Sequence, residues 1–194
     1  MIRFIVLAIL AVLSGCAGSP KINFYTLDAP PYPEVHGTDA SRLSILLGPV
    51  TLMEIVDRPQ LVIRTGGNRV EVIDTSRWAQ PLKGETARVL AANLAREMGT
   101  LQVYLHGQGM ASDHDIRVTV DILRFESLPG VAASLEALWS VRRKDGGAPL
   151  AGRSVVREAV QIDGYEPLVA AHSRALARVS RDIAAAIRAA GFGK

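Results

Sequence analysis

The most regular pattern in the chain is an alternation of apolar and polar residues in its second half. Apolar residues fill every second position over residues 116–122, at the start of a strand-like segment that extends to residue 126. A period of two places successive side chains on opposite faces of a β-strand. The alternation returns around Trp139, and Arg153–Ile162 is a third such segment after the Gly146-Gly147 turn signal. The pattern predicts an antiparallel meander of three strands.

Two other segments carry apolar residues at helical spacing. The first runs from Glu85 to Met98 and precedes Gly99, a residue type that often ends helices. Its apolar stripe consists of Ala87, Leu90, Ala91, Leu94, Ala95 and Met98. The second follows Asp163 and Glu166, which have the spacing of a capping box, and ends at Gly191. Its stripe consists of Leu168, His172, Ala175, Leu176, Val179, Ile183, Ala186 and Ile187.

Shorter strand signals lie on either side of the first helix. Residues 22–27, 43–50 and 101–105 are rich in apolar and β-branched side chains. Residues 60–73 predict a β-hairpin, because Gly66-Gly67-Asn68 accepts the positive φ of a tight turn. Two amphipathic helices need a sheet face to cover. The order of elements therefore predicts an α+β fold: a two-layer α/β sandwich whose mixed or mostly antiparallel sheet is covered by two amphipathic helices.

The first sixteen residues have the features of a lipoprotein signal. Arg3 precedes an apolar run, Phe4–Leu13, which is about half as long as a membrane-spanning helix. The run ends in Leu13-Ser14-Gly15-Cys16, which resembles the bacterial lipobox. We therefore expect residues 1–15 to be a signal peptide, and Cys16 to carry covalent diacylglyceryl and N-acyl lipid such as palmitate. The alternatives are an uncleaved helix, or a cleaved soluble protein with a chance cysteine.

The lipoprotein interpretation divides the rest of the chain into two parts. Residues 16–42 would comprise the lipidated N-terminus, a short strand and a proline-rich tether, and residues 43–194 one folded domain. More than one acyl chain gives stable attachment, so the domain is expected to be lipid-anchored and to face the periplasm. Ala17 stands where an Asp tends to retain lipoproteins in the inner membrane, which favours the outer membrane.

The composition excludes several kinds of site and partner. The chain has 194 residues, of which 48% are apolar and 21% charged, as in a folded globular protein. Cys16 is the single cysteine, which excludes an internal disulfide and a cysteine-based zinc site. The net charge of +3 is weak support for nucleic-acid binding, and aromatic residues are not interleaved with basic ones. We expect no nucleic-acid partner.

No catalytic or metal-binding motif stands out. The four histidines lack HExxH spacing, and His172 lies on the apolar stripe of the last helix, as a core or interface histidine would. Asp113-His114-Asp115 is interpreted as a polar turn rather than a cation site. The cluster Arg142-Arg143-Lys144 favours a solvated turn over contact with anionic lipid. The sequence predicts a protein that is not an enzyme and has no metal, and no cofactor other than its covalent lipid.

A more specific signature lies between residues 48 and 82. Its first part is Gly48-Pro49-Val50-Thr51-Leu52 with Asp57-Arg58-Pro59-Gln60, and its second part is Arg77-Trp78-Ala79-Gln80-Pro81-Leu82. With Phe24-Tyr25-Thr26-Leu27, these segments resemble the ABC-type transport auxiliary lipoproteins, which include a paraquat-inducible lipoprotein that works with MCE (mammalian cell entry) proteins. The candidate structural or partner-contact residues are Asp57, Arg58, Pro59, Gln60, Arg77, Trp78 and Pro81.

The resemblance implies a non-catalytic outer-membrane subunit of an MCE/ABC-type intermembrane lipid transport system. The expected partners are an MCE-domain protein, which forms a hydrophobic conduit, and an inner-membrane permease and ATPase. The lipoprotein would dock the conduit at the far membrane, and a homo-oligomeric ring would match such a conduit.

Other interpretations of the motifs and of the function are compatible with the sequence. The motifs can be structural, with Asp57 accepting local N–H bonds, Arg58 pairing with a carboxylate and Trp78 filling a gap over the first helix. The protein can instead regulate or assemble another cell-envelope machine, such as a cell-wall synthase or a secretion channel. A hydrolase is the third functional class, and no motif in the sequence favours it.

Overall fold

The computed structural model describes residues 20–29, 31, 43–107 and 114–192. Every strand and helix predicted from the sequence is present, in the predicted order. The elements are β1 (Asn23–Tyr25), β2 (Ile45–Thr51), β3 (Gln60–Arg64), β4 (Val70–Trp78), α2 (Leu82–Met98), β5 (Val103–Leu105), β6 (Ile116–Leu128), β7 (Ala132–Arg143), β8 (Leu150–Ala159) and α3 (Tyr165–Ala189).

The larger sheet has five strands in the order β5-β2-β6-β7-β8. β2 runs parallel to β5 and β6, whereas β6, β7 and β8 are antiparallel neighbours, which confirms the predicted meander. β2 also passes close to the end of β5. A Cβ on Gly48 would lie 2.7 Å from the Cβ of His106, and Gly48 has φ 121°, so this position requires glycine.

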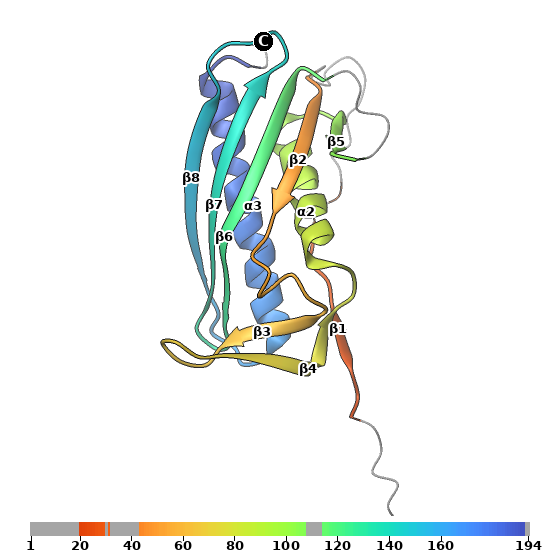
Figure 1. Ribbon diagram of the computed structural model, residues 1–194, viewed down its shortest axis with the longest axis vertical. Coiled ribbons are helices and arrows are strands. Elements are labelled where there is room, and N and C mark those ends of the chain that lie inside the picture. Colours follow the sequence, from red (N-terminus) through yellow and green to blue (C-terminus); the bar gives the residue numbers. More distant parts are fainter. Residues whose placement is uncertain (1–19, 30, 32–42, 108–113, 193–194) are drawn as a thin grey trace, which may run out of the picture.

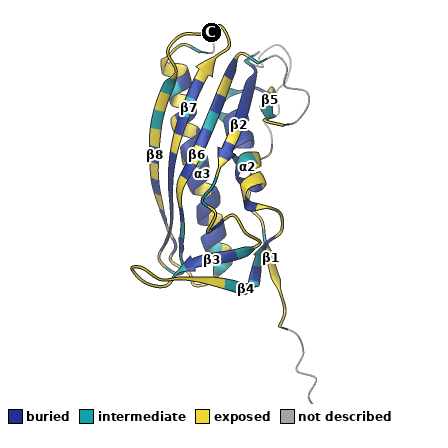
Figure 2. Cartoon of the chain, viewed as in Figure 1, coloured by how far each residue is buried: buried dark blue, intermediate teal, exposed yellow. Residues whose placement is uncertain are grey.

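Both helices cover one face of this sheet (Figure 1). α2 packs against β2 and β5, α3 packs against β7 and β8, and the two helices pack against each other. Buried residues lie between these layers (Figure 2). The structure therefore confirms the α+β class, with a mixed sheet and two helices. No helix within the described residues has the length and hydrophobicity needed to cross a membrane.

The remaining strands form a separate three-stranded sheet, in the order β1-β4-β3, at the end of the molecule opposite the C-terminus (Figure 1). The sequence pattern predicts one sheet, and the structure has two. β3 and β4 form the expected hairpin, whereas β1 pairs in parallel with the last residues of β4, with Tyr25 beside Trp78. Ile63 of β3 packs on Ala133 and Leu168 and so joins this sheet to the main body.

Both helix starts differ from the prediction. α2 begins at Leu82 rather than Glu85, because the C=O of Pro81 already accepts the N–H of Glu85 at 3.1 Å. The capping box predicted for α3 is wrong: its N-cap is Gly164, and no side chain caps the helix. Asp163 points elsewhere, since its Oδ1 lies 2.6 Å from the position that a Cβ on Gly130 would take.

Candidate functional site

The two motif segments meet at one pocket, although a hairpin separates them in the sequence. The pocket has a volume of about 410 Å³. It is lined by Asp57, Arg58, Pro59, Trp78, Ala79, Gln80, Pro81 and Leu82. Of the candidate motif residues, only Gln60 and Arg77 are not part of this lining.

Backbone hydrogen bonds hold the segments of the signature together. The N–H of Trp78 donates to the C=O of Pro59 at 2.7 Å, which joins the second motif to the first. The N–H of Ala79 donates to the C=O of Tyr25 at 2.8 Å. Because Tyr25 belongs to β1, the Phe24–Leu27 segment lies beside the other two motif segments at this pocket, whereas Gly48–Leu52 contributes no residue to its lining.

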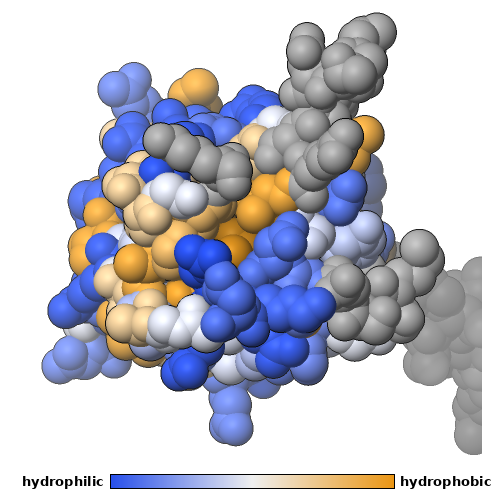
Figure 3. Space-filling view, turned by 90° about the horizontal axis from the view of Figure 1, so that it is seen from above, coloured by the Kyte–Doolittle hydropathy of each residue, from blue (hydrophilic) through white to orange (hydrophobic). Residues whose placement is uncertain are grey.

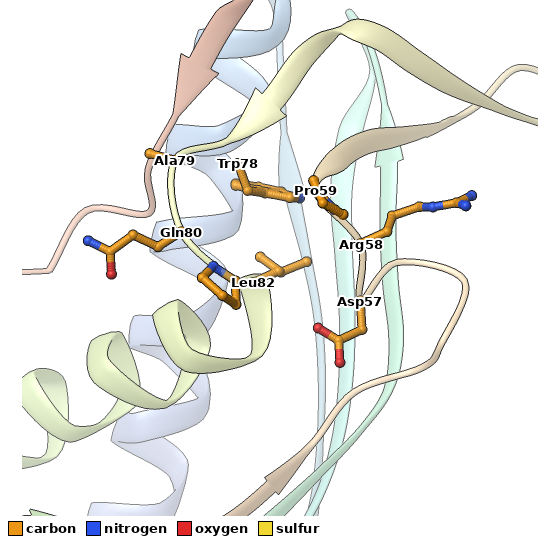
Figure 4. Close-up of a pocket in the computed structure, with 8 residues that line it drawn as sticks. Asp57, Arg58, Pro59, Trp78, Ala79, Gln80 and Leu82 are labelled. Atoms are coloured by element: carbon orange, nitrogen blue, oxygen red, sulfur yellow. The ribbon is translucent and has the colours of Figure 1, made fainter.

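The middle of the pocket is apolar. The buried side chains of Trp78 and Leu82 face Pro59 there (Figure 4). The Trp78 ring packs edge-to-face on Phe125 of β6, with the ring centroids 6.2 Å apart. The indole is therefore fixed between the small sheet and the large one, and it presents a rigid apolar surface to the pocket.

The rim of the pocket is polar and exposed. Asp57, Arg58 and Gln80 are all exposed, and Arg58 and Gln80 extend to opposite sides (Figure 4). Within the described residues, Arg58 makes no ion pair and the Asp57 carboxylate accepts no hydrogen bond. The structural roles considered for these two side chains are therefore not observed. An apolar centre inside an exposed polar rim has the composition of a small protein-binding surface.

Gln60 and Arg77 lie beside each other in the β3–β4 ladder. The pairing register shifts immediately after Gln60, so β4 carries an irregular stretch there. The Nε of Arg77 donates to the C=O of Asp74 at 3.2 Å and stabilises this stretch locally. The lipobox residues lie outside the described part of the chain: Leu13, Ser14, Gly15 and Cys16.

A buried carboxylate ties the Phe24–Leu27 segment to α2. The Oε2 of Glu85 accepts hydrogen bonds from the Thr26 hydroxyl at 2.7 Å and from the Leu27 N–H at 3.0 Å. Arg88 lies 3.4 Å from the other carboxylate oxygen and donates to the C=O of Leu27 at 2.9 Å. Burial alone would raise the pKa of Glu85, but hydrogen bonds from Thr26, Arg88 and Leu27 outweigh burial and lower the pKa.

Only one feature of the sequence indicates the contact between Glu85 and the Phe24–Leu27 segment. Glu85 lies in the first turn of α2, where the helix dipole favours a carboxylate. That position would fit an exposed Glu equally well. The burial of Glu85 follows from the return of the chain after β1, which no local pattern encodes.

His172 is a core residue, as predicted. It is 1% exposed, its Nε2 lies 2.8 Å from the Ser127 hydroxyl, and its ring stacks on Phe125 at a centroid distance of 3.9 Å. Burial lowers the pKa of His172 from 6.5 to about 3, so the ring is neutral at neutral pH. His172 therefore joins α3 to β6 inside the core and cannot contact an external substrate.

The remaining sequence candidates also have structural contacts. The Asp115 carboxylate accepts the Ser44 N–H at 2.7 Å and the Ser44 hydroxyl at 2.8 Å, and these bonds lower the pKa of Asp115. Arg143 of the basic cluster pairs with Asp145 and lies 5.3 Å from the centre of the Phe192 ring. In the described ranges, no three His, Cys, Asp or Glu side chains are grouped so that they could hold a metal ion.

Comparison with known families identifies the chain. The model of a family described as "ABC-type transport auxiliary lipoprotein component" matches residues 25–184, which include the whole pocket. The chain belongs to this family. It is thus an auxiliary component of ABC-type transport, and the lipoprotein character of the family indicates an association with the cell envelope. None of the curated proteins matches the sequence.

Solved structures support the fold. One described as an uncharacterized protein has a TM-score of 0.69 at 20% identity and covers 86% of this chain and 99% of its own. XCC0632 from Xanthomonas campestris, of the DUF330 family, has a TM-score of 0.61 at 18% identity, with 85% and 90% covered. A PelC dodecamer from Paraburkholderia phytofirmans reaches only 0.45 at 11% identity, with 79% and 91% covered, which is too distant to bear on function.

Proposed function

We propose that this protein is a non-catalytic lipoprotein subunit of an MCE/ABC-type intermembrane lipid transport system. In this proposal, lipid on Cys16 holds the domain at the outer membrane, facing the periplasm. The domain then docks the MCE conduit, which an inner-membrane permease and ATPase supply with lipid. Family membership supports the auxiliary transport role, and the lipobox supports the anchor.

The observation that carries the proposal is the pocket shared by the motif segments. Fold stability accounts for Trp78 and Leu82, which are buried, but not for Asp57, Arg58 and Gln80, which are exposed. Unpaired polar side chains around an apolar centre are suited to a partner that inserts an apolar side chain and pairs its own polar groups with the rim. We therefore assign the pocket to contact with the MCE-domain protein.

A non-catalytic role also agrees with the site. Asp57 is the only acidic side chain of the pocket lining, and the lining contains no histidine, serine or cysteine to act with it. General acid–base or nucleophilic catalysis needs a second group within hydrogen-bond reach. The pocket therefore suits binding rather than turnover.

Co-purification from native membranes tests the proposal. Tagged wild-type protein, extracted in mild detergent, is expected to recover MCE-domain and permease subunits, identified by mass spectrometry. Arg58→Glu reverses the charge at the rim and is expected to reduce that recovery. Arg181→Glu is the matched control, because Arg181 is exposed on α3 and, like Arg58, has no ion pair among the described residues.

Three results would contradict the proposal. Recovery of no MCE or permease subunit would remove the transport role. Recovery of a cell-wall synthase or a secretion channel instead would favour the other cell-envelope machines. An equal loss with Arg58→Glu and Arg181→Glu would show that the pocket is not the contact.

A further inference from the structure

Exposed apolar side chains concentrate at the end of the molecule where β1 enters the fold. The described residues include eleven large apolar side chains that are exposed. Six of them lie just before or on β1, on β4 and in the two turns that close this end, namely Ile22, Phe24, Val70, Val72, Val131 and Ile162. We call these six side chains the anchor-end surface. Exposed apolar side chains that gather at one end of a molecule mark a candidate site of contact with protein or membrane.

The structure places these positions at the same end of the molecule. β6 runs parallel to β2 towards the three-stranded sheet, so the β6–β7 turn and the start of α3 reach the same end (Figure 1). The N–H of Val160 donates to the C=O of Val131 at 3.0 Å, which places the chain just before Ile162 beside the β6–β7 turn. Tyr165 then packs edge-to-face on Tyr25 at 6.3 Å and joins this turn to β1.

Phe24 is the most prominent member of the surface. Its neighbour Tyr25 faces inward, towards Tyr165, whereas the Phe24 side chain is 65% exposed beside Arg77. Nothing within the described fold covers it. Exposing a phenylalanine to water is unfavourable, so a contact that removes it from water would be stabilising.

The length of the chain before β1 identifies the surface that meets these side chains. Cys16 lies seven residues before Asn23, the first residue of β1, and seven residues span at most about 25 Å when fully extended. β1 is fixed to the body through its pairing with β4 and through Glu85. A lipid on Cys16 therefore keeps this end of the domain close to the bilayer.

The opposite end of the domain cannot contact the membrane while the end that carries β1 does so. β6 alone has 13 residues and so measures roughly 44 Å from end to end. That far end carries its own apolar side chains, framed by hydrophilic ones (Figure 3). It also carries Arg142 and Arg143, at the end of β7. These apolar side chains and the two arginines are directed away from the bilayer when the anchor end rests on it.

We propose that the anchor-end surface rests on the lipid bilayer into which the acyl chains of Cys16 insert. The proposal depends on the lipid anchor of the proposed function and adds an orientation to it. Lys21, Arg69 and Arg77 exceed the nearby acids Glu71 and Asp74 by only one charge, so the contact is mainly apolar in character. Zwitterionic phosphatidylcholine is therefore sufficient, and anionic lipid is not required.

Site-specific fluorescence on the lipidated full chain tests the orientation. Because lipidation converts the Cys16 thiol to a thioether, an introduced cysteine is the only reactive thiol. Phe24→Cys, Val72→Cys and Val155→Cys each receive an environment-sensitive dye, and the proteins are reconstituted in phosphatidylcholine vesicles with or without doxyl-labelled lipid. Val155 is the matched control, because it is 69% exposed but lies on the open face of the large sheet.

Dyes at positions 24 and 72 are expected to shift to shorter emission wavelengths and to lose intensity with doxyl lipid, whereas the dye at 155 is expected to do neither. Absence of quenching at both 24 and 72, or equal quenching at all three positions, would overturn the orientation and leave the transport role standing. The intact mass of the purified protein shows whether Cys16 carries lipid, and so distinguishes a wrong orientation from a missing anchor. A Cys16 without lipid would contradict the anchor of the proposed function and remove the basis of this orientation as well.

Discussion

The five-stranded sheet and the three-stranded sheet differ in what accounts for their side chains. In the large sheet, Val118, Val120 and Leu135 face the helices and are fully buried, so packing explains the alternation that the sequence shows. In the small sheet and its adjoining turns, Asp57 and Arg58 belong to the signature motif and yet are exposed. Side chains that a fold does not need for packing are candidates for contact with another molecule.

The two regions are also held together differently. The large sheet and its helices share an apolar core to which α3 contributes Leu176, Val179 and Ile183, all fully buried. The first strand of the small sheet depends in addition on a charged contact, in which Glu85 accepts the Thr26 hydroxyl and the Leu27 N–H. Substitutions in the large sheet should therefore lower global stability, whereas those near the small sheet should act locally or on binding.

The largest loss of stability is expected from Leu176→Ala. Leu176 is fully buried between α3 and the rest of the core, and truncation of such a side chain costs about 2–5 kcal/mol through lost transfer free energy and the remaining cavity. Urea denaturation followed by circular dichroism measures it. A change below about 1 kcal/mol would show that the α3 interface is not the main source of stability.

The next largest effect is a pH dependence due to His172. Its folded-state pKa of about 3 lies below the unfolded value of 6.5, so only the unfolded state binds a proton between those pH values. The resulting stability is complete above pH 6.5 and is lost as the pH falls towards 3. Between pH 7.5 and 5 the free energy of unfolding should fall by about 2 kcal/mol.

The control is His172→Gln, which can still bond to Ser127 but does not titrate. Over the same pH range the variant should lose much less stability than the wild type. Equal slopes in the two proteins would show that another group titrates on unfolding. The range stays above the usual pKa of carboxylates, so Glu85 and Asp115 contribute only a small part of the change.

A smaller and more local effect is expected from Glu85→Gln. The amide keeps one acceptor oxygen but loses the charge that strengthens the bonds to Thr26, Leu27 and Arg88, at a cost of roughly 1–3 kcal/mol. Hydrogen exchange should show reduced protection of the Leu27 amide, with β6 and β7 unchanged. Glu97→Gln on the same helix is the control, and equal loosening in both variants would contradict the assigned role.

The smallest effect on stability belongs to the pocket rim. Arg58→Glu is expected to change the free energy of unfolding by less than about 0.5 kcal/mol, because Arg58 is exposed and has no ion pair among the described residues. Thermal unfolding beside the wild type measures it. A loss comparable with that of Leu176→Ala would mean that Arg58 serves the fold, and would remove the contrast between the two regions.

Local patterns predicted the elements well because packing dictates them. The alternation in β6 and the stripe of α3 follow directly from their burial on one face. The division into two sheets could not be predicted, because the parallel pairing of β1 with β4 depends on contacts such as Glu85 with Leu27, far apart in the chain. The capping box failed for a similar reason, since Asp163 is directed towards Gly130.

The candidate site was predicted in its residues but not in its geometry. Trp78 and Pro59 come from separate motifs, and only the hairpin between them brings them together, with the Trp78 N–H bonded to the C=O of Pro59. Ala79, Gln80 and Leu82 join the lining because they follow Trp78 around the start of α2. Gln60 and Arg77 carry the same motifs, but their places in the β3–β4 ladder keep them out of the lining.

Photocrosslinking in cells tests the central claim most directly. Benzoylphenylalanine in place of Gln80, at the exposed rim of the pocket, is expected to crosslink to the MCE-domain protein on irradiation. The same group in place of Arg181, exposed on α3, is expected to give no such product. Crosslinks from both positions alike, or from neither, would contradict the assignment of this pocket to the transport partner.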